Sequence, residues 1–303
     1  MKSLIKILPL LFLFCQKEKT MERTEIIFGS YFRVKITGEE KVVSKALAEV
    51  FSEMKRYNNL FSIFSDSSEV SRLNRNGRLK ASGDLLAIIR KGREIGDLTD
   101  GAFTITIYPL MEIWGFYQRS YHLPKEEEIT EKRNLVGDER VIIKGDSVYL
   151  LSGTKIDLGG IAVGYALDRA YEILKRYGIK KGLIDGGGDI LVFGDSYKIG
   201  IKDPRREGLI ETLNLKDGAV STSGDYENYF EIEGRRFSHI IDPKTGYPKE
   251  GVKSVTVFGK EATICDALST ALFVLGERGE DYIKKFPGYQ AIVYLSDGRR
   301  LKW

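Results

Sequence analysis

Short strand-forming runs separated by glycine-containing turns make up most of the chain from residue 141 onward. Two of the turns, at residues 145–146 and 233–234, each join two such runs, which is the pattern of a β-hairpin. Two apolar helices are predicted among these runs, at residues 162–177 and 262–275. Hairpins combined with a few crossover helices predict an α+β fold whose sheet is mostly antiparallel.

The first half of the chain adds a further hairpin and more helices. Residues 22–37 alternate polar with β-branched and aromatic side chains around a glycine, which predicts a hairpin. Apolar residues recur at helical spacing in 42–60, and 85–95 predicts a second helix. The polar, acidic stretch at 124–130 predicts a surface excursion, whereas 183–193 predicts one strand interrupted by three glycines.

The composition is that of a globular protein, with 42% hydrophobic and 30% charged residues. The formal net charge is +4, and no basic block or basic stripe with interleaved aromatic residues occurs, so nucleic acid is not an expected partner. No internal repeat or low-complexity linker divides the chain. We therefore predict one domain over residues 21–303, preceded by a segment at 1–20 that does not belong to the fold.

That N-terminal segment has the order of an export signal. Two lysines precede the apolar run at residues 7–14, which is too short to span a bilayer, and Cys15 follows it. This position of Cys15 favours a bacterial lipoprotein, exported and held by lipid at the periplasmic side of the inner membrane. The bulky Phe14 before it, where a small residue is usual, keeps open an ordinary secretory signal or a buried N-terminal strand. Cys265, the only other cysteine, is predicted to be a small buried apolar residue without a disulfide.

The segment from Asp157 to Asp168 passes from a strand through Gly159 and Gly160 directly into a helix. Backbone N–H groups at a helix start carry partial positive charge and bind phosphate readily. The alternative is a tight strand-to-helix turn in which the glycines only solve a backbone problem. The spacing matches neither the Walker A loop nor the dinucleotide fingerprint, and the triple glycine at 186–188 does not match that fingerprint either.

Two further patterns suit a ligand with phosphate groups. Asp266 and Thr270 lie four residues apart on one face of a predicted helix, and their oxygen atoms suit Mg²⁺; the alternative is a helix cap and a hydroxyl bonded to its own helix. His239 titrates near neutrality and is able to accept a proton from a hydroxyl, although a lone histidine is more often structural. The hydroxyl-rich turn at 221–225 contributes contacts at most, and His122 is predicted to lie in a surface loop.

Taken together and in order, these motifs resemble the ApbE family of FAD:protein FMN transferases. The similarity runs from about residue 26 to about residue 294. Each segment alone is weak, but their number and order make the resemblance specific. The segments are 61–74, Asp100-Gly101-Ala102-Phe103, Pro109-Leu110 with Trp114-Gly115-Phe116, 157–168, 186–189, 222–224, and those around His239 and Asp266.

The resemblance implies a T-fold-like α+β architecture and a reaction. A threonine or serine hydroxyl of an acceptor protein, expected to be a subunit of a membrane redox complex, attacks the FMN-side phosphorus of FAD, and AMP leaves. It implies that His239 is the base and that Mg²⁺ is held by Asp266, Thr270 and the backbone carbonyl of Ala162. The residues it implies for flavin nucleotide binding are Phe64, Ala102, Phe103, Thr104, Gly159, Tyr165 and Ile240.

The chain departs from the family pattern at two positions. Many relatives have lysine in place of Val163 and aspartate in place of Thr104. The first change removes a positive charge near the phosphates, and the second removes a carboxylate near the flavin, so we expect effects on rate or on the balance between transfer and hydrolysis. Two alternatives remain open: Mg²⁺-dependent hydrolysis of FAD to FMN and AMP, and a flavin-binding lipoprotein without activity.

Overall fold

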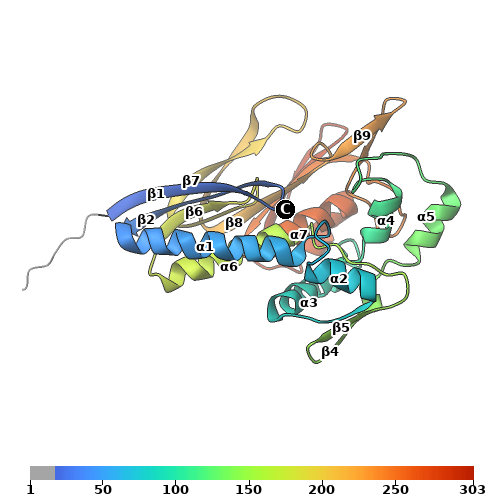
Figure 1. Cartoon of the computed structure of the whole chain (residues 1–303). Helices are drawn as coiled ribbons and strands as arrows, with labels where there is room; N and C mark the ends of the chain where they lie inside the picture. Colours follow the sequence, from blue (N-terminus) through green and yellow to red (C-terminus); the bar gives the residue numbers. More distant parts are fainter. Residues whose placement is uncertain (1–17) are drawn as a thin grey trace, which may run out of the picture.

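The computed structural model describes residues 18–303 and is built around one eight-stranded sheet (Figure 1). Every neighbouring pair of strands in this sheet is antiparallel. The predicted α+β class with a mostly antiparallel sheet is therefore confirmed. In spatial order the strands are β1 (Glu18–Ile27), β2 (Ser30–Glu39), β6 (Lys181–Asp185), β7 (Ile190–Lys202), β8 (Leu209–Gly224), β11 (Val252–Gly259), β12 (Gln290–Leu295) and β13 (Arg300–Lys302).

Helices cover one face of this sheet and form the main core with it (Figure 1). The apolar positions that predicted the first helix, from Val43 to Tyr57, are buried on it. Alternate residues of the strands, such as Leu191, Val255 and Val293, point into the same core. The helices are α1 (Glu40–Phe61), α2 (Glu69–Asn76), α3 (Gly83–Leu98), α6 (Ala162–Arg176), α7 (Ala262–Leu275) and the short α8 (Gly279–Ile283).

The opposite face of the sheet is covered by the far ends of its own two longest strands. The pairing of β7 with β8 is irregular near Gly194 and Asp217, both of which have positive φ, and Gly194 N–H donates to Asp217 Oδ1 at 2.6 Å. Beyond this bend, Ile201 packs against Ile292 and Tyr294 of β12, although β8 and β11 separate β7 from β12 in the sheet. The two strand ends, residues 196–202 and 209–216, therefore form a hairpin that folds over the outer face; we call it the folded hairpin.

A second, smaller core is rich in aromatic residues. It lies beside the sheet, where α4 (Tyr108–Ile113) and α5 (Glu126–Arg133) meet the hairpin of β9 (Tyr229–Ile232) and β10 (Arg235–Ser238). Trp114 is at its centre, with its ring 5.7 Å from Phe237 and 6.4 Å from Phe230. A three-stranded sheet of β3 (Arg78–Lys80), β5 (Ser147–Leu150) and β4 (Val141–Lys144) completes the fold.

The structure differs from two expectations. The first described strand, β1, includes residues 18–20 of the segment predicted for export, and the rest of that segment, including Cys15, lies outside the described residues. The polar stretch near residue 124 contains α5, whose buried Ile129 anchors it. The interrupted strand at 183–193 is two strands, β6 and β7, joined by the triple glycine. Within residues 18–303 no helix has both the length and the apolar character needed to cross a bilayer.

Candidate functional site

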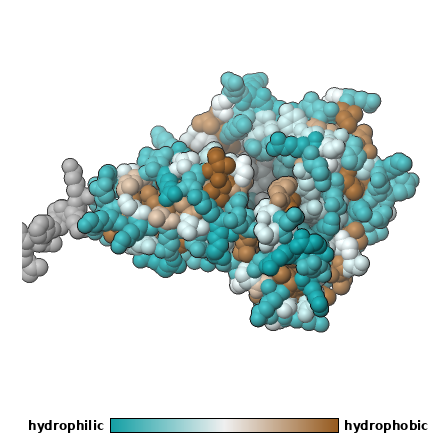
Figure 2. Space-filling model, in the orientation of Figure 1, coloured by the Kyte–Doolittle hydropathy of each residue, from teal (hydrophilic) through white to brown (hydrophobic). Residues whose placement is uncertain are grey.

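A cavity with a volume of about 660 Å³ lies between the start of α6, the face of α7, the β1–β2 turn and the segment after β10. Figure 2 shows the surface hollowed between the sheet and the α2–α5 part of the molecule, with hydrophobic residues at the edge of the hollow. Eight of the residues predicted for the site line the cavity: Ala102, Phe103, Thr104, Gly159, His239, Ile240, Asp266 and Thr270.

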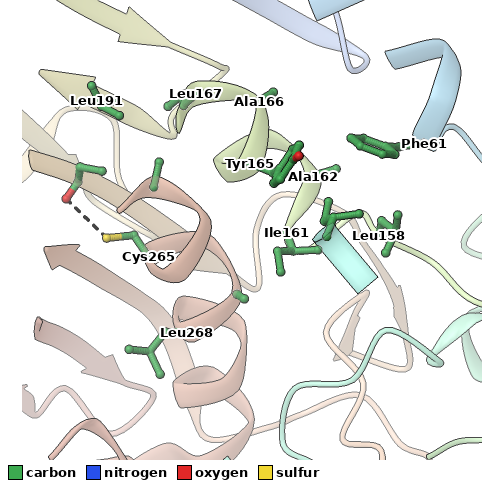
Figure 3. Close-up of a cluster of buried hydrophobic side chains, with 14 of the residues drawn as sticks. Phe61, Leu158, Ile161, Ala162, Tyr165, Ala166, Leu167, Leu191, Cys265 and Leu268 are labelled. Atoms are coloured by element: carbon green, nitrogen blue, oxygen red, sulfur yellow. Dashed lines mark hydrogen bonds between the residues drawn. The ribbon is translucent and has the colours of Figure 1, made fainter. Parts of the chain in front are cut away.

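Three predicted residues do not line it. Tyr165 is buried against Tyr57 and Phe61 of α1, and its hydroxyl donates to Asp84 Oδ1 of α3 at 3.0 Å. Ala162 is buried at the first position of α6 (Figure 3). Phe64 is 76% exposed, and its ring contacts that of Tyr117 edge-on at 6.2 Å. The fold therefore places Tyr165 and Ala162 in the core and Phe64 on the surface, outside the cavity lining.

Two carboxylates, of which that of Asp266 is buried, join α6 and α7 by exchanging helix caps. Gly164 N–H in the first turn of α6 donates to Asp266 Oδ2 at 3.0 Å. Reciprocally, Asp168 of α6 accepts from the N–H groups of Ala262 and Thr263, each at 2.9 Å, at the start of α7. Each carboxylate thus meets the positive end of the other helix dipole. The capping expected for Asp266 is present, but the helix that it caps is α6 and not its own.

The absence of a side chain at Gly164 makes this junction possible. A Cβ there would lie 2.4 Å from the carbonyl oxygen of Ala262 and 2.8 Å from Asp266 Cβ. Further along the cavity wall the contact is looser, since a Cβ on Gly160 would be at an ordinary contact distance of 3.5 Å from Thr270 Oγ1. The glycine turn and the acidic face of α7, which are over a hundred residues apart in the sequence, are therefore neighbours.

Burial raises the pKa of Asp266 well above the usual carboxyl range, and the nearby charge of Asp189 raises it further, while Gly164 N–H opposes both. Asp189 also lines the cavity, and burial raises its pKa to about 6 against the opposing effect of the Ser221 hydroxyl. Two carboxylates held in a buried site repel each other when both are ionised. A cation in the cavity would relieve this repulsion.

Uncharged oxygen atoms surround Asp266. Ser223 Oγ lies 3.2 Å from Thr270 Oγ1 and 2.7 Å from Ser269 Oγ, so three hydroxyls from β8 and α7 form one hydrogen-bonded group. Thr270 thus bonds to a strand across the cavity wall and shows no bond back to its own helix. Carboxylate and hydroxyl oxygens are hard ligands of the kind that Mg²⁺ prefers. Residues 18–303 contain no group of three or more His, Cys, Asp or Glu side chains arranged for a metal, so any cation here would depend on these uncharged oxygens.

The backbone at the glycine turn is only partly used by the protein itself. Gly159 N–H donates to Asp157 Oδ1 at 2.8 Å, and the N–H groups of Ile161 and Ala162 donate to the Leu158 carbonyl. The next N–H group along the chain that has a partner belongs to Gly164.

This leaves four backbone groups of the turn without a hydrogen-bond partner among residues 18–303: the N–H groups of Gly160 and Val163, and the carbonyls of Gly159 and Gly160. The Gly160 carbonyl is free because its helical partner, Gly164 N–H, donates to Asp266 instead. Both Gly160 and Val163 line the cavity. Their free N–H groups suit an anion, and the free carbonyl oxygens next to them suit a cation. The triple glycine differs, since the N–H groups of Gly187 and Gly188 both donate to Asp185 Oδ1 at 3.1 Å.

His239 enters the cavity wall from the aromatic core. Its Nδ1 lies 3.1 Å from the Asn228 carbonyl, and its backbone N–H donates to the same oxygen at 2.9 Å. A carbonyl only accepts hydrogen bonds, so Nδ1 carries the proton and Nε2 of the neutral ring is left as an acceptor. Burial lowers the pKa of His239, with the Asn228 bond opposing, which keeps the ring neutral at physiological pH.

Three further predictions concern Thr104, Cys265 and His122, of which only Thr104 lines the cavity. Thr104 lines the cavity, but its hydroxyl is 2.6 Å from Asp138 Oδ1, a carboxyl whose pKa burial raises to about 6. Cys265 is buried as predicted, with Sγ 3.5 Å from the Ala219 carbonyl (Figure 3). His122 is exposed in a loop, also as predicted.

Sequence reasoning gave no role to several residues that the structure brings to the site. Asp157 holds the glycine turn through Gly159 and accepts from the Tyr117 hydroxyl at 2.7 Å. Asp189 and Lys202 line the cavity from either end of β7. The position of Asp157 directly before two glycines was a usable signal for the first, whereas nothing local marks the other two.

Comparisons with known proteins agree with this architecture. The model of a family described as the ApbE family matches residues 28–293. The FAD:protein FMN transferase of Vibrio cholerae is 31% identical over 91% of this chain and 89% of its own length. The crystal structure of the ApbE protein of Thermotoga maritima superposes with a TM-score of 0.88 and 36% identity, covering 94% of this chain and 97% of that one. The apo flavinyl transferase ApbE of Pseudomonas stutzeri gives a TM-score of 0.84 and 30% identity, covering 94% of each chain.

Proposed function

The chain belongs to the ApbE family, and we propose that it is an FAD:protein FMN transferase, which moves FMN from FAD to a hydroxyl of an acceptor protein and releases AMP. The observation that carries the proposal is the meeting of Asp266, Thr270 and the Gly159-Gly160 turn in one cavity. The turn offers free N–H groups to an anion, and the face of α7 offers oxygen atoms to a cation. A diphosphate with its metal ion is the ligand that needs both.

We propose Mg²⁺ as that cation, and the residues present fit it. Asp266 supplies the single carboxylate, and Thr270 supplies a hydroxyl. The backbone carbonyl of Ala162 stays the predicted third ligand, and the free carbonyls of Gly159 and Gly160, which line the cavity beside Thr270, are alternatives to it. The bound ion would neutralise charge on the diphosphate oxygens.

The residues of this chain then divide the work of phosphoryl transfer. The N–H groups of Gly160 and Val163 orient the phosphate and stabilise the charge that builds on its oxygens. Nε2 of His239 accepts the proton of the acceptor hydroxyl as its oxygen forms the new bond to the FMN-side phosphorus. The bond from that phosphorus to the bridging oxygen breaks, and the electron pair leaves with AMP. Ala102, Phe103 and Ile240 provide the apolar surface for the flavin half.

Incubation of the protein with FAD, Mg²⁺ and an acceptor that carries the target threonine or serine tests the proposal. Fluorescence of FMN on the denatured acceptor, together with stoichiometric AMP, supports transfer. Free FMN and AMP with an unlabelled acceptor would indicate FAD hydrolysis by the same site. Stoichiometric FAD binding without AMP at any Mg²⁺ concentration would indicate a flavin-binding protein without activity.

We also propose that the protein works outside the cytoplasm, anchored by lipid on Cys15, on acceptor subunits of membrane redox complexes. The support is the order of residues 1–15. Covalent attachment would keep FMN on a redox protein in a compartment where free flavin is lost by diffusion. Mass spectrometry of the protein from membranes tests this: a lipid-modified Cys15 at the N-terminus supports it, and a chain that retains residues 1–14 contradicts it.

A further inference from the structure

Most of the charged side chains that line the cavity are negative and would repel an anionic dinucleotide; one is positive. Among the described residues 18–303, four carboxylates line it, those of Asp157, Asp189, Glu227 and Asp266, against a single lysine or arginine side chain, Lys202. FAD carries two phosphate charges, and a metal ion at Asp266 offsets only part of the negative total. Lys202 is therefore the one cationic side chain of the lining that is able to attract the phosphates.

The charge of Lys202 is not neutralised by the protein. No carboxylate of residues 18–303 lies within salt-bridge distance of its Nζ. Its contact is instead with the face of the Tyr226 ring, with Nζ 5.0 Å from the ring centroid. Tyr226 also lines the cavity, and burial raises its pKa to about 12, so the ring is neutral. This cation–π contact orients the ammonium group and leaves its charge available to a ligand.

The folded hairpin explains why both ends of β7 lie at the same cavity. Asp189 precedes β7 and Lys202 ends it, yet both line one cavity. The strand bends at Gly194 and returns over the outer face of the sheet, where Ile201 is anchored on β12. Lys202, next to that anchored residue, is thus held by the fold and not by a mobile loop tip.

The position of Lys202 also assigns it to one half of the substrate. Two apolar lining residues, Met111 and Ile241, come from α4 and the aromatic core and suit the flavin. Lys202, Tyr226 and Glu227 belong to the polar part of the lining, next to the hydroxyl-rich end of β8. We propose that Lys202, oriented by Tyr226, binds the phosphate of the AMP half of FAD and stabilises AMP as the leaving group. This rests on the proposed function.

In chemical terms the ammonium group acts on the oxygen atoms of the departing phosphate. As the acceptor oxygen bonds to the FMN-side phosphorus, the bridging oxygen keeps the electron pair of the broken bond and remains on AMP. Negative charge grows on that phosphate, and a nearby fixed cation stabilises it. Lys202 gains and loses no proton in this step.

Equilibrium binding to the full-length protein in the presence of Mg²⁺, without acceptor, tests the assignment. Calorimetry with AMP, FMN and FAD compares the native protein with Lys202→Gln. We expect the Kd of AMP and of FAD to rise about fivefold to tenfold, which is the scale of one partly exposed charged hydrogen bond. The Kd of FMN should change less than twofold. An unchanged AMP Kd, or an equal loss for FMN and AMP, would overturn the proposal.

Three variants serve as controls. Lys198→Gln removes a lysine from the same face of β7 outside the cavity lining, so it should leave all three Kd values unchanged. Lys202→Arg should retain most of the AMP affinity, and Tyr226→Leu should weaken AMP binding while the fold is retained by circular dichroism. Because no acceptor is present, the binding result is independent of FMN transfer. Lys202-dependent AMP binding in a protein that transfers no FMN would reject the transferase function and keep this site.

Discussion

The two walls of the cavity are built in different ways. The α6–α7 wall, with Asp266 and Thr270, is fixed by backbone groups: each helix start donates to a carboxylate of the other helix, and Gly164 lets the two backbones touch. The opposite wall, with His239, is fixed by side chains: an aromatic core around Trp114 packs under a segment of irregular backbone.

The difference suits the two kinds of chemistry proposed. A metal ion and a diphosphate need oxygen atoms and N–H groups at set positions, which hydrogen-bonded helix ends provide with little freedom. A base that accepts a proton from a second protein must stand where that protein is able to approach, and aromatic packing tolerates small adjustments. We therefore expect substitutions of supporting residues to act sharply in the α6–α7 wall and by degrees in the His239 wall, whereas loss of His239 itself removes the proton acceptor.

The largest effect is expected from Asp266→Asn. The variant keeps an oxygen atom for Gly164 N–H but loses the only charge proposed for the metal, so FMN transfer should fall by at least about a hundredfold. Stability should not fall. The folded-state pKa of Asp266 is raised, so its ionised form is disfavoured in the fold, and that cost disappears in the amide.

Product assays with FAD and thermal melts check this prediction, with Asp281→Asn, an exposed carboxylate of α8, as the control. Near-normal AMP release from Asp266→Asn would reject the metal assignment.

Gly164→Ala should have the next largest effect, and on both stability and activity. Its new Cβ would press on the Ala262 carbonyl and on Asp266, so the helices must separate. Overpacking of this kind costs about 1–3 kcal/mol. Gly83→Ala is the matched control, because that helical glycine has open space around it. Denaturant melts of both variants decide the point: equal stability of the two would show that the α6–α7 contact is not tight.

His239→Ala should slow transfer by roughly a hundredfold, the usual scale for loss of a general base. FAD binding should change much less, because the ring is assigned to the proton and not to the nucleotide. An equal loss of rate and of affinity would make His239 a binding residue.

The pH dependence of the native protein adds a second check on His239. Its pKa is lowered from 6.5, so the ring stays neutral and able to accept a proton down to below that pH. Activity governed by this ring should hold through neutrality and fall only as the pH drops below 6.5. A rate profile of kcat/KM at constant ionic strength measures this. In His239→Ala the acidic limb should disappear.

The smallest effect is expected from Trp114→Phe. It keeps an aromatic ring in the second core but removes the bond from Nε1–H to the Gly246 carbonyl, 2.9 Å long, which secures the turn after His239. The stability loss should be about 1 kcal/mol, with a few-fold loss of transfer rate. Trp303→Phe, in which no such bond is lost, is the control. A hundredfold loss of rate in Trp114→Phe would contradict the tolerance expected of this wall.

Much of this protein was readable from its sequence. Residues 262–275 were predicted as a helix with the bounds that the structure has, and the hairpins of β1–β2, β4–β5 and β9–β10 were predicted from turn residues and alternation. The helix α5 was missed because its pattern is almost wholly polar and one buried residue, Ile129, holds it in place. Local pattern carries no information about a single long-range contact of that kind.

The sequence by itself determined the fold class, the family and the eight predicted residues that line the cavity, because hydrophobic period, turn chemistry and ordered motifs are local properties of a chain. Only the tertiary structure decided that Asp266 caps α6, that Tyr165 is turned into the core, and that Lys202 returns to the cavity over a folded hairpin. These facts depend on which surfaces meet when helices and strands pack, and on how many backbone groups each contact leaves without a partner.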